Sequence, residues 1–272
     1  MRVASDPVRG GARQDALSPR PPSGEESLCE DQAMSQQPPH VKPTASVYID
    51  GLNLYRRLLA GRPELKWLNV EALAEHLLPE YDIVRVRYFT AVIKALPGAD
   101  ATSPQRQQVY LRALRSLPRT TVELGKFRID PRVMPVHPTE WEPDGSPRRV
   151  RVKKTEEKGS DVALASRLLV DAMHGDADLF VVLTNDSDLV MPLRLVREDL
   201  NREVGLLSPM QPKRASNELK QTNPTLHRHV TPEAVAASQL PDVLRVDVGT
   251  FHRPRKWSGN SEGSAEAEPS NQ

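Results

Sequence analysis

The feature that most limits how this chain can fold is the regular alternation of strand-type and helix-type segments. Short apolar runs are followed by segments in which apolar residues recur every three or four positions. Strand-type runs lie at 46–50, 82–92, 120–127, 178–184 and 203–208, and helix-type segments at 52–60, 70–78, 103–117, 160–174 and 188–199. This alternation needs right-handed crossovers between parallel strands. The sequence therefore predicts an α/β fold of Rossmann-like type, an open parallel sheet with helices on both faces.

Polar residues mark where three of the helices begin. Asn69, Ser103 and Ser160 stand at the expected N-caps, and Pro104 suits a first helical turn. Between the third strand-type run and the helix at Ser160, the alternation is interrupted. Apolar and basic residues alternate in VRVKK, and PDG is a turn signal. A basic β-hairpin near 127–154, projecting beside the sheet, is the expected structure.

The two ends of the chain differ from the middle in composition. Residues 1–44 and 258–272 are rich in polar residues and lack both the helical and the strand period, so we expect them to be disordered. One main domain is expected at 45–230. Residues 231–257 are expected to form a C-terminal extension on or beside it. Within that extension, FHRPRKW is either a basic-aromatic docking strip or an ordered end of the fold.

Overall charge and cysteine content indicate the cellular environment of the protein rather than its activity. The chain has 37 Lys and Arg against 36 Asp and Glu, a formal charge of +1, so any attraction to a polyanion must come from local patches. Because Cys29 is the only cysteine, the chain can form neither an intramolecular disulfide nor a cysteine-based zinc site. No run approaches the roughly 20 apolar residues that span a bilayer, and no secretory signal is present at the N-terminus. We expect a cytoplasmic protein without a membrane partner.

Acidic residues follow two of the predicted strands. Asp50 ends the first, and Asp186 and Asp188 come just after the apolar run at 179–183. Asp161 lies at the start of the helix before that run, near the same edge of the sheet. Four carboxylates at one edge repel each other unless a cation neutralises them. Because no cysteine or histidine lies beside these motifs, the ligands are all oxygen, which suits Mg²⁺ or Mn²⁺ and hydrolysis of a phosphate ester.

Each of these aspartates also has a simpler explanation. An aspartate at a strand end or N-cap is common, and taken singly Asp50, Asp161 or Asp186 is more often a cap than a metal ligand. Asp188 is about equally well placed to cap the helix that follows it. The metal hypothesis therefore depends on the joint placement of the four side chains.

Three blocks of the sequence resemble a known family. YIDGLNLY, EKGSDVALASRLL and LTNDSDLVMPLRLV are similar to the signature blocks of the NYN domain, the LabA-like branch of the PIN-like nuclease superfamily. The resemblance covers roughly 45–210 and implies a Rossmann-like fold and an Mg²⁺- or Mn²⁺-dependent ribonuclease activity. The matched positions are Asp50, Asn53, Lys158, Asp161, Asp186 and Asp188. In the third block, Thr184 and Asn185 replace the family's serine and glycine, and asparagine tolerates left-handed backbone better than most residues.

Together, the strand-end pattern and the resemblance suggest a mechanism. Asp50, Asp161 and Asp186 would hold the metal, Asp188 would bind it directly or through water, and an activated water would attack phosphorus in line. Asn53 would orient a water or the scissile phosphate, or only cap the helix after it. Thr184 would position a carboxylate or only satisfy a backbone group.

RNA is the expected partner. The sequence leaves open whether the chain forms a homo-oligomer. Arg149, Arg151 and Lys153 stand at alternate positions just before Lys158, which would place three cations on one face of a strand. Such cations neutralise phosphates without regard to sequence, although a basic edge strand also serves only to discourage strand pairing. Arg85 and Arg87 with Tyr88 form a second candidate cluster.

Three other functions compete with the ribonuclease. A non-catalytic RNA-binding or assembly module would keep the carboxylates for stability alone. A phosphatase of the haloacid dehalogenase type needs D-x-D at the first strand end, where this chain has Asp50, Gly51 and Leu52. A dinucleotide-binding oxidoreductase needs G-x-G-x-x-G after that strand, which is missing. The sequence therefore favours the ribonuclease and the binding module over the phosphatase and the oxidoreductase.

Overall fold

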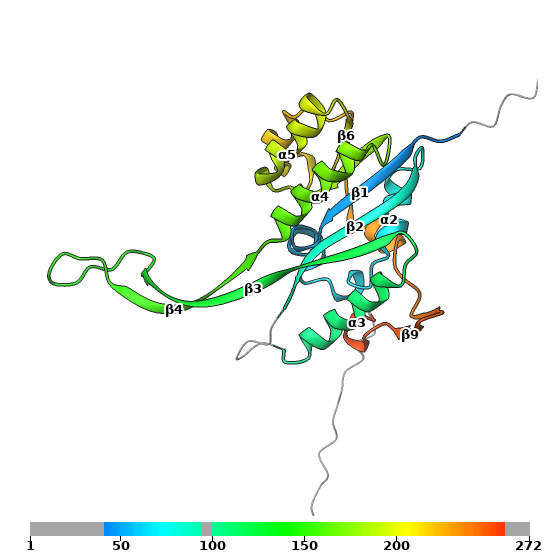
Figure 1. Cartoon of the computed structure of the whole chain (residues 1–272). Helices are drawn as coiled ribbons and strands as arrows, with labels where there is room; N and C mark the ends of the chain where they lie inside the picture. The colour runs from blue at the N-terminus through cyan, green and yellow to red at the C-terminus, as the bar shows by residue number, and fades with distance from the viewer. Residues whose placement is uncertain (1–40, 94–99, 259–272) are drawn as a thin grey trace, which may run out of the picture. The chain divides into compact units, whose positions relative to one another are not determined.

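The computed structural model describes residues 41–93 and 100–258 (Figure 1). The disorder expected for 1–44 and 258–272 falls almost entirely outside these ranges. Seven strands form one sheet in the order β4-β3-β2-β1-β5-β6-β7, and every neighbouring pair is parallel except β3 with β4. The strands are β1 (Thr44–Asp50), β2 (Asp82–Val92), β3 (Thr120–Pro135), β4 (Arg149–Lys158), β5 (Leu179–Leu183), β6 (Glu203–Ser208) and β7 (Leu226–His229). Without β4, this is the Rossmann strand order, which confirms the predicted fold class.

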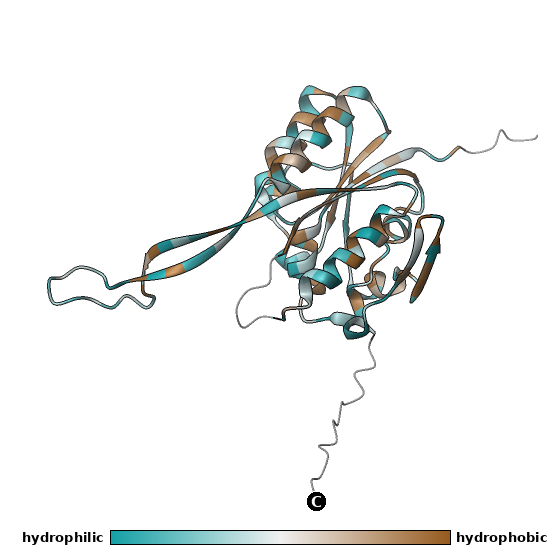
Figure 2. Ribbon diagram, turned by 60° about the horizontal axis from the view of Figure 1, so that its bottom comes forward, coloured by the Kyte–Doolittle hydropathy of each residue, from teal (hydrophilic) through white to brown (hydrophobic). Residues whose placement is uncertain are grey.

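Helices cover both faces of the sheet (Figure 1). They are α1 (Gly51–Leu54), α2 (Val70–Leu77), α3 (Ser103–Arg115), α4 (Ser160–His174), α5 (Val190–Arg194), α6 (Asn217–Lys220) and α7 (Pro232–Ala237), with shorter helical turns at Tyr55–Leu59, Pro63–Leu65, Ser187–Leu189, Leu195–Asp199, Pro212–Arg214 and Arg255–Trp257. Alternate residues of β1 point to opposite faces, so Val47 and Ile49 join one core and Tyr48 the other. Figure 2 shows the apolar residues concentrated where the helices meet the strands.

Two of the three expected helix caps differ from the prediction. Asn69 caps α2 as expected, because its side chain accepts hydrogen bonds from the backbone N–H groups of Glu71 and Ala72. Ser103 and Ser160, in contrast, are the first helical residues rather than the caps. The N-cap residue of α4 is Gly159. Its φ of 98° lies in the left-handed region, which glycine adopts without steric cost.

The predicted hairpin is present and extends to Lys158 on its second strand. β3 pairs with β2 over Thr120–Lys126 and then continues beyond the sheet, paired only with β4 (Figure 1). Gly145, with φ of 81°, lies in the PDG turn of the connection. We call the paired stretches 127–135 and 149–157 the β3–β4 ribbon.

The C-terminal extension is an ordered part of the fold. A small hairpin of β8 (Val243–Val246) and β9 (Gly249–His252) leads to Trp257, which is 9% exposed. The Trp257 ring lies 6.3 Å from that of Trp67 and 6.1 Å from that of Tyr110. Of the two alternatives for FHRPRKW, the structure selects the ordered end. No helix among the described residues is both long and apolar enough to cross a membrane.

Candidate functional site: the acidic edge of the sheet

Asp50 ends the strand at which the order of the sheet reverses. β1 lies between β2 and β5, so the carboxyl end of β1 is the place where open α/β sheets bind ligands. The Asp50 side chain is 4% exposed. Its Oδ1 accepts a hydrogen bond of 2.9 Å from the backbone N–H of Asn53, and its Oδ2 accepts one of 3.0 Å from the Thr184 hydroxyl.

A short chain of hydrogen bonds links the end of β1 to the loop after β5. The Thr184 hydroxyl donates to Asp50 and accepts from the backbone N–H of Asp186 at 3.0 Å. Asn53 Oδ1 accepts from the backbone N–H of Asn185 at 3.2 Å. Asn53 and Thr184 thus hold the two acidic segments together. Asn185 is not among the described residues with positive φ, so its replacement of glycine causes no backbone strain.

Asp186 and Asp188 occupy different positions in the turn after β5. Asp186 Oδ1 accepts a hydrogen bond of 3.1 Å from the backbone N–H of Asp188, which makes Asp186 the cap of the turn Ser187–Leu189. The capping role considered for Asp188 therefore belongs to Asp186. Asp188 is exposed in the first turn, where its carboxylate is accessible to solvent.

Asp161 and Asp188 line one groove at this edge. The groove has a volume of about 290 Å³, and Lys158 and Glu157 also line it. Burial raises the pKa of Asp161, and the charges of Glu157, Asp186 and Asp188 raise it further. Asp161 is therefore within electrostatic reach of acidic residues from β4 and from the loop after β5.

Burial and the neighbouring charges also act on Asp50. Burial raises the pKa of Asp50 to about 6, and the charges of Asp161 and Asp186 add to this shift against the hydrogen bonds from Asn53 and Thr184. Carboxylates that destabilise one another's charged forms are the electrostatic setting that a cation relieves. The donors are all oxygen, which suits a hard divalent ion.

The positions of the carboxylates do not form a closed cage. Within residues 41–93 and 100–258, no three acidic, histidine or cysteine side chains already converge on one point as ligands. Mg²⁺ commonly keeps several waters and takes only one or two carboxylates directly. The arrangement of Asp50, Asp161, Asp186 and Asp188 fits a hydrated ion held partly through water better than one held by four direct bonds.

The sequence analysis missed one residue near the site, Glu157, and assigned another, Tyr88, to a different cluster. Glu157 Oε1 accepts a hydrogen bond of 3.0 Å from the backbone N–H of Ser160, and this places its charge near Asp161. Tyr88 packs against Gly51: a Cβ on Gly51 would lie 2.5 Å from the Tyr88 Cζ. Glu157 had a sequence signal, because it is four residues before Asp161 at the end of a predicted strand. Tyr88 was expected beside Arg85 and Arg87 in a basic cluster, and nothing in the local pattern indicated its contact with Gly51.

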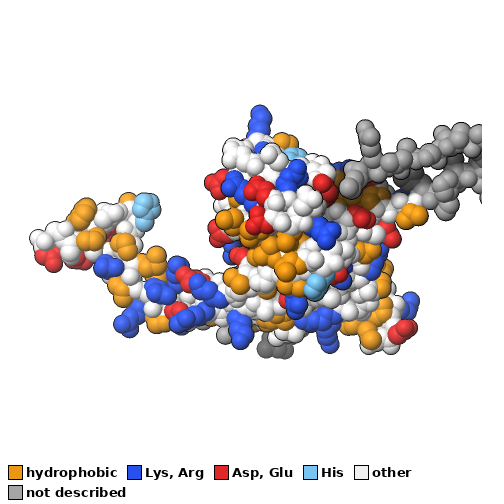
Figure 3. Space-filling model, turned by 45° about the horizontal axis from the view of Figure 1, so that its top comes forward, with side chains coloured by type: hydrophobic (Ala, Val, Ile, Leu, Met, Phe, Trp, Pro, Cys, Tyr) orange, Lys and Arg blue, Asp and Glu red, His pale blue; other side chains and the backbone are white. Residues whose placement is uncertain are grey.

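The basic residues of the β3–β4 ribbon divide between its two faces. Arg149, Arg151 and Lys153 lie opposite Pro135, Val133 and Pro131 on one face, and none has an acidic partner among the described residues. The basic residues of the other face are paired with acids. These pairs are Arg128–Asp130, Arg132–Asp130, Lys154–Glu156 and Lys158–Glu156. Figure 3 shows Lys and Arg side chains gathered along the ribbon.

The second basic cluster expected from the sequence is not available to a nucleic acid. Arg87 donates to Asp171 at 2.7 and 3.0 Å, and Arg85 donates to Asp176 at 2.7 Å. Tyr88 is buried in the core. The composition of the strand alone is compatible with a binding patch. Both arginines are instead bound by acidic residues far away in sequence, Asp171 of α4 and Asp176 of the turn after it.

A mostly parallel α/β sheet with carboxylates gathered at the end of its central strand defines a protein of the PIN-like class. The chain belongs to the NYN domain family, whose model matches residues 44–228. It is similar to 6-hydroxy-3-succinoylpyridine 3-monooxygenase HspA from Pseudomonas putida, with 31% identity over 239 residues, 79% of this chain and 76% of that protein. A crystal structure of a protein of unknown function from Vibrio parahaemolyticus matches with a TM-score of 0.45 and 16% identity, covering 72% of this chain and 96% of that one.

Proposed function

We propose that the protein is a metal-dependent ribonuclease of the LabA-like branch, which hydrolyses phosphodiester bonds with Mg²⁺ or Mn²⁺. One observation carries the proposal: Asp50, Asp161 and Asp186 come from three separate segments, yet they lie close enough for the charges of Asp161 and Asp186 to raise the pKa of Asp50. A fold gains no stability from placing like charges beside a buried carboxylate. Their placement is accounted for by a cation that neutralises them.

The residues of the site have distinct roles in this proposal. Asp50, fixed by Asn53 and Thr184, is the buried anchor of the divalent ion. Asp161 and Asp188, which line the groove, and Asp186 would hold the ion directly or through water. When bound, the ion supplies positive charge for the scissile phosphate and lowers the pKa of a water. Asn53 and Thr184 act by positioning Asp50 and the loop after β5.

The substrate is attracted by cations outside the acidic edge. Lys158 lines the groove beside Asp161, and the unpaired face of the ribbon presents Arg149, Arg151 and Lys153. Phosphate contacts by such residues give affinity that falls as salt rises. A single RNA strand that follows the unpaired face of the ribbon toward the sheet would bring one of its phosphates to the carboxylates.

The test is cleavage of end-labelled single-stranded RNA by the full chain with Mg²⁺ or Mn²⁺. Cleavage should stop with EDTA and in Asp186→Asn, whereas Asp199→Asn, an exposed aspartate of the turn after α5, should cleave normally. Equal cleavage by Asp186→Asn would reject the proposal. Binding of RNA without any shortening would instead support the non-catalytic module.

A second candidate function comes from the relative. Its name describes oxygenation of a substituted pyridine, and 31% identity across most of both chains favours testing the same activity here. We rank hydrolysis first for two reasons. Carboxylates occupy the sheet edge, and β1 ends in Asp50 and continues as GLN rather than as the glycine-rich loop that binds a dinucleotide. The test is to measure oxygen consumption with 6-hydroxy-3-succinoylpyridine and a reduced nicotinamide or flavin. Oxygen consumption that persists in Asp186→Asn would favour the oxygenase.

A further inference from the structure

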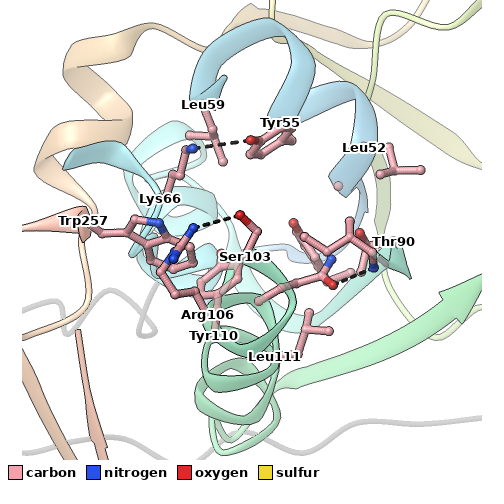
Figure 4. Close-up of a pocket in the computed structure, with 14 residues that line it drawn as sticks. Leu52, Tyr55, Leu59, Lys66, Thr90, Ser103, Arg106, Tyr110, Leu111 and Trp257 are labelled. Carbon is pink, nitrogen blue, oxygen red and sulfur yellow. Dashed lines mark hydrogen bonds between the residues drawn. The ribbon is translucent and has the colours of Figure 1, made fainter. Parts of the chain in front are cut away.

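We infer that a pocket beside Gly51 binds a single six-membered aromatic ring that carries an acidic group. The pocket lies between the segment Gly51–Leu59 and helix α3, with Trp257 from the C-terminal end at its side (Figure 4). This inference does not depend on the hydrolysis proposed above, because the pocket is built from other residues.

The size of the pocket limits what can enter it. Its volume is about 160 Å³. A cavity of about 150 Å³ in another protein is large enough to bind benzene, so this one accommodates one six-membered ring but not the fused rings of a purine, and a sugar attached to the ring would lie outside it. Pockets for larger ligands have volumes of roughly 300 to 1,000 Å³.

The walls of the pocket are mainly aromatic and aliphatic. Tyr55, Tyr88, Tyr110 and Trp257 line it together with leucine side chains. Aromatic walls favour a planar aromatic ligand, which can meet them by stacked or edge-to-face contacts. Trp257 is held in place by contacts with Tyr110 and Trp67, so this wall exists before any ligand enters.

Two cationic side chains at the pocket favour an anionic substituent on the ring. The Lys66 ammonium lies 3.3 Å from the Tyr55 hydroxyl and has no carboxylate partner among the described residues. Arg106 donates to Asp100 at 2.6 Å and to Ser103 at 2.8 Å, while its buried Nε has no hydrogen-bond partner within the described chain. Figure 4 shows Lys66 and Arg106 beside the opening between the aromatic rings.

The charges around the pocket do not cancel. Asp100 accepts from Arg106 at 2.6 Å and from Lys256 at 2.7 Å, so one carboxylate serves two cations. Among the described residues, Lys66 and Arg106 are the charged ones that line the pocket, so its lining carries two positive charges and no carboxylate. A carboxylate or phosphate on the bound ring would restore the balance, and a bidentate contact with Arg106 is the strongest form that this interaction can take.

The position of the pocket relates it to the acidic edge. Gly51 lines the pocket and directly follows Asp50, and the Tyr88 ring lies against Gly51 with no room for a Cβ between them. Two sources supply the required ligand chemistry: a pyrimidine nucleotide, free or within RNA, and a free aromatic acid. The same contacts would recognise either.

The two sources can be separated by titrating the full-length protein. Uridine monophosphate, adenosine monophosphate and benzoate are added in turn, and binding is followed by calorimetry and by tryptophan fluorescence. We expect saturable binding of uridine monophosphate, benzoate or both, weaker binding of adenosine monophosphate, and weaker binding of the uncharged analogues uridine and benzyl alcohol. Lys66→Gln should weaken binding by about tenfold, which corresponds to about 1.4 kcal/mol, whereas Lys213→Gln, distant in the fold, should not.

Each result has a defined meaning. Binding of uridine monophosphate assigns the pocket to a nucleotide, and binding of benzoate alone assigns it to a small acid. The inference is overturned if no single-ring anion binds, if adenosine monophosphate binds as tightly as uridine monophosphate, or if Lys66→Gln has no effect. Circular dichroism of Lys66→Gln guards against a folding defect. RNA cleavage by the unaltered chain is scored separately, so loss of the ribonuclease proposal leaves this result intact.

Discussion

At the scale of single residues, two buried aspartates have opposite electrostatic surroundings. Asp50 lies among other acids and its pKa is raised to about 6. Burial also raises the pKa of Asp171, but hydrogen bonds from Arg87 and Tyr48 outweigh it and hold this pKa below its usual value. Asp171 is therefore a stabilising residue of the fold, whereas Asp50 carries the electrostatic cost expected of a ligand-binding group.

Asp171→Asn should lower the free energy of unfolding by about 3 kcal/mol, because it leaves Arg87 without its main partner in a largely buried position. Urea unfolding at pH 7 measures the change. Asp176→Asn is the matched control: Asp176 pairs with Arg85 nearer the surface, so its loss should cost less than about 1 kcal/mol. Equal losses in both variants would contradict the assignment.

The same pair predicts a pH dependence. Because the pKa of folded Asp171 lies below its ordinary value of 3.8, its contribution is fully present above that value and is lost as pH falls through the folded pKa. The stability difference between the unaltered chain and Asp171→Asn should therefore be constant near neutral pH and shrink below about pH 4. A difference that grew on acidification would have the wrong sign.

Residues at strand ends could be predicted from the sequence, and residues recruited from elsewhere could not. Asp50 ends one apolar run and Asp186 comes three residues after the end of another, so their arrival at one edge follows from parallel strands alone. Tyr88 and Glu157 reach the site through the pairing of β1 with β2 and of β3 with β4. The ion pairs of Arg85 and Arg87 with α4 and its following turn depend on packing between distant segments, which local patterns do not encode.

At the scale of elements, the β3–β4 ribbon shows what alternation can and cannot predict. The spacing of Arg149, Arg151 and Lys153 placed them correctly on one face. The acids of the opposite face, Asp130 and Glu156, each lie two residues from their cationic partners on the same strand, so the same alternation could have indicated these ion pairs. The two faces therefore differ in whether their basic residues have acidic partners, although both contain basic residues.

Replacing Arg149, Arg151 and Lys153 together by glutamine should weaken RNA binding and make it less dependent on salt. For single strands, the logarithm of the binding constant falls with the logarithm of salt concentration by about 0.7 per phosphate contact. Three lost contacts should therefore reduce the slope by about 2. The measurement is fluorescence anisotropy over a salt series with Asp186→Asn, which keeps the RNA intact.

The control for the ribbon is the triple glutamine variant of Arg128, Arg132 and Lys154 in the same background. These three residues are engaged with Asp130 and Glu156, so their loss should change the salt dependence little. If both triple variants reduced binding equally, general positive charge rather than one face would explain the affinity, and the proposed path of RNA would fail.

At the scale of the whole molecule, the fold extends beyond the part that matches the family. The match ends at residue 228, yet Trp257 packs with Trp67 and Tyr110 in the same core. Trp67 Nε1 also donates to the backbone carbonyl of Pro241 at 2.8 Å. The sequence suggested an extension on or beside the domain, but its apolar content was too low to show that it completes the core.

A chain ending at residue 240 should be less stable by at least about 3 kcal/mol, because it loses Trp257 and leaves the rings of Trp67 and Tyr110 exposed. Thermal and urea unfolding measure the loss. A chain ending at Ser258 should match the full chain, which also tests the expectation that 258–272 is disordered. Full stability of the shorter chain would show that the extension contributes nothing to the core.

The ribbon is inserted where β3 leaves the sheet and before α4 begins, at the edge that holds the carboxylates. No core residue of the two hydrophobic clusters comes from 127–157. Selection can therefore lengthen, shorten or recharge this segment without disturbing the core or the carboxylates at the sheet edge. In the proposed ribonuclease, target preference and catalytic competence would then evolve as separate traits, because the ribbon and the carboxylates belong to different segments.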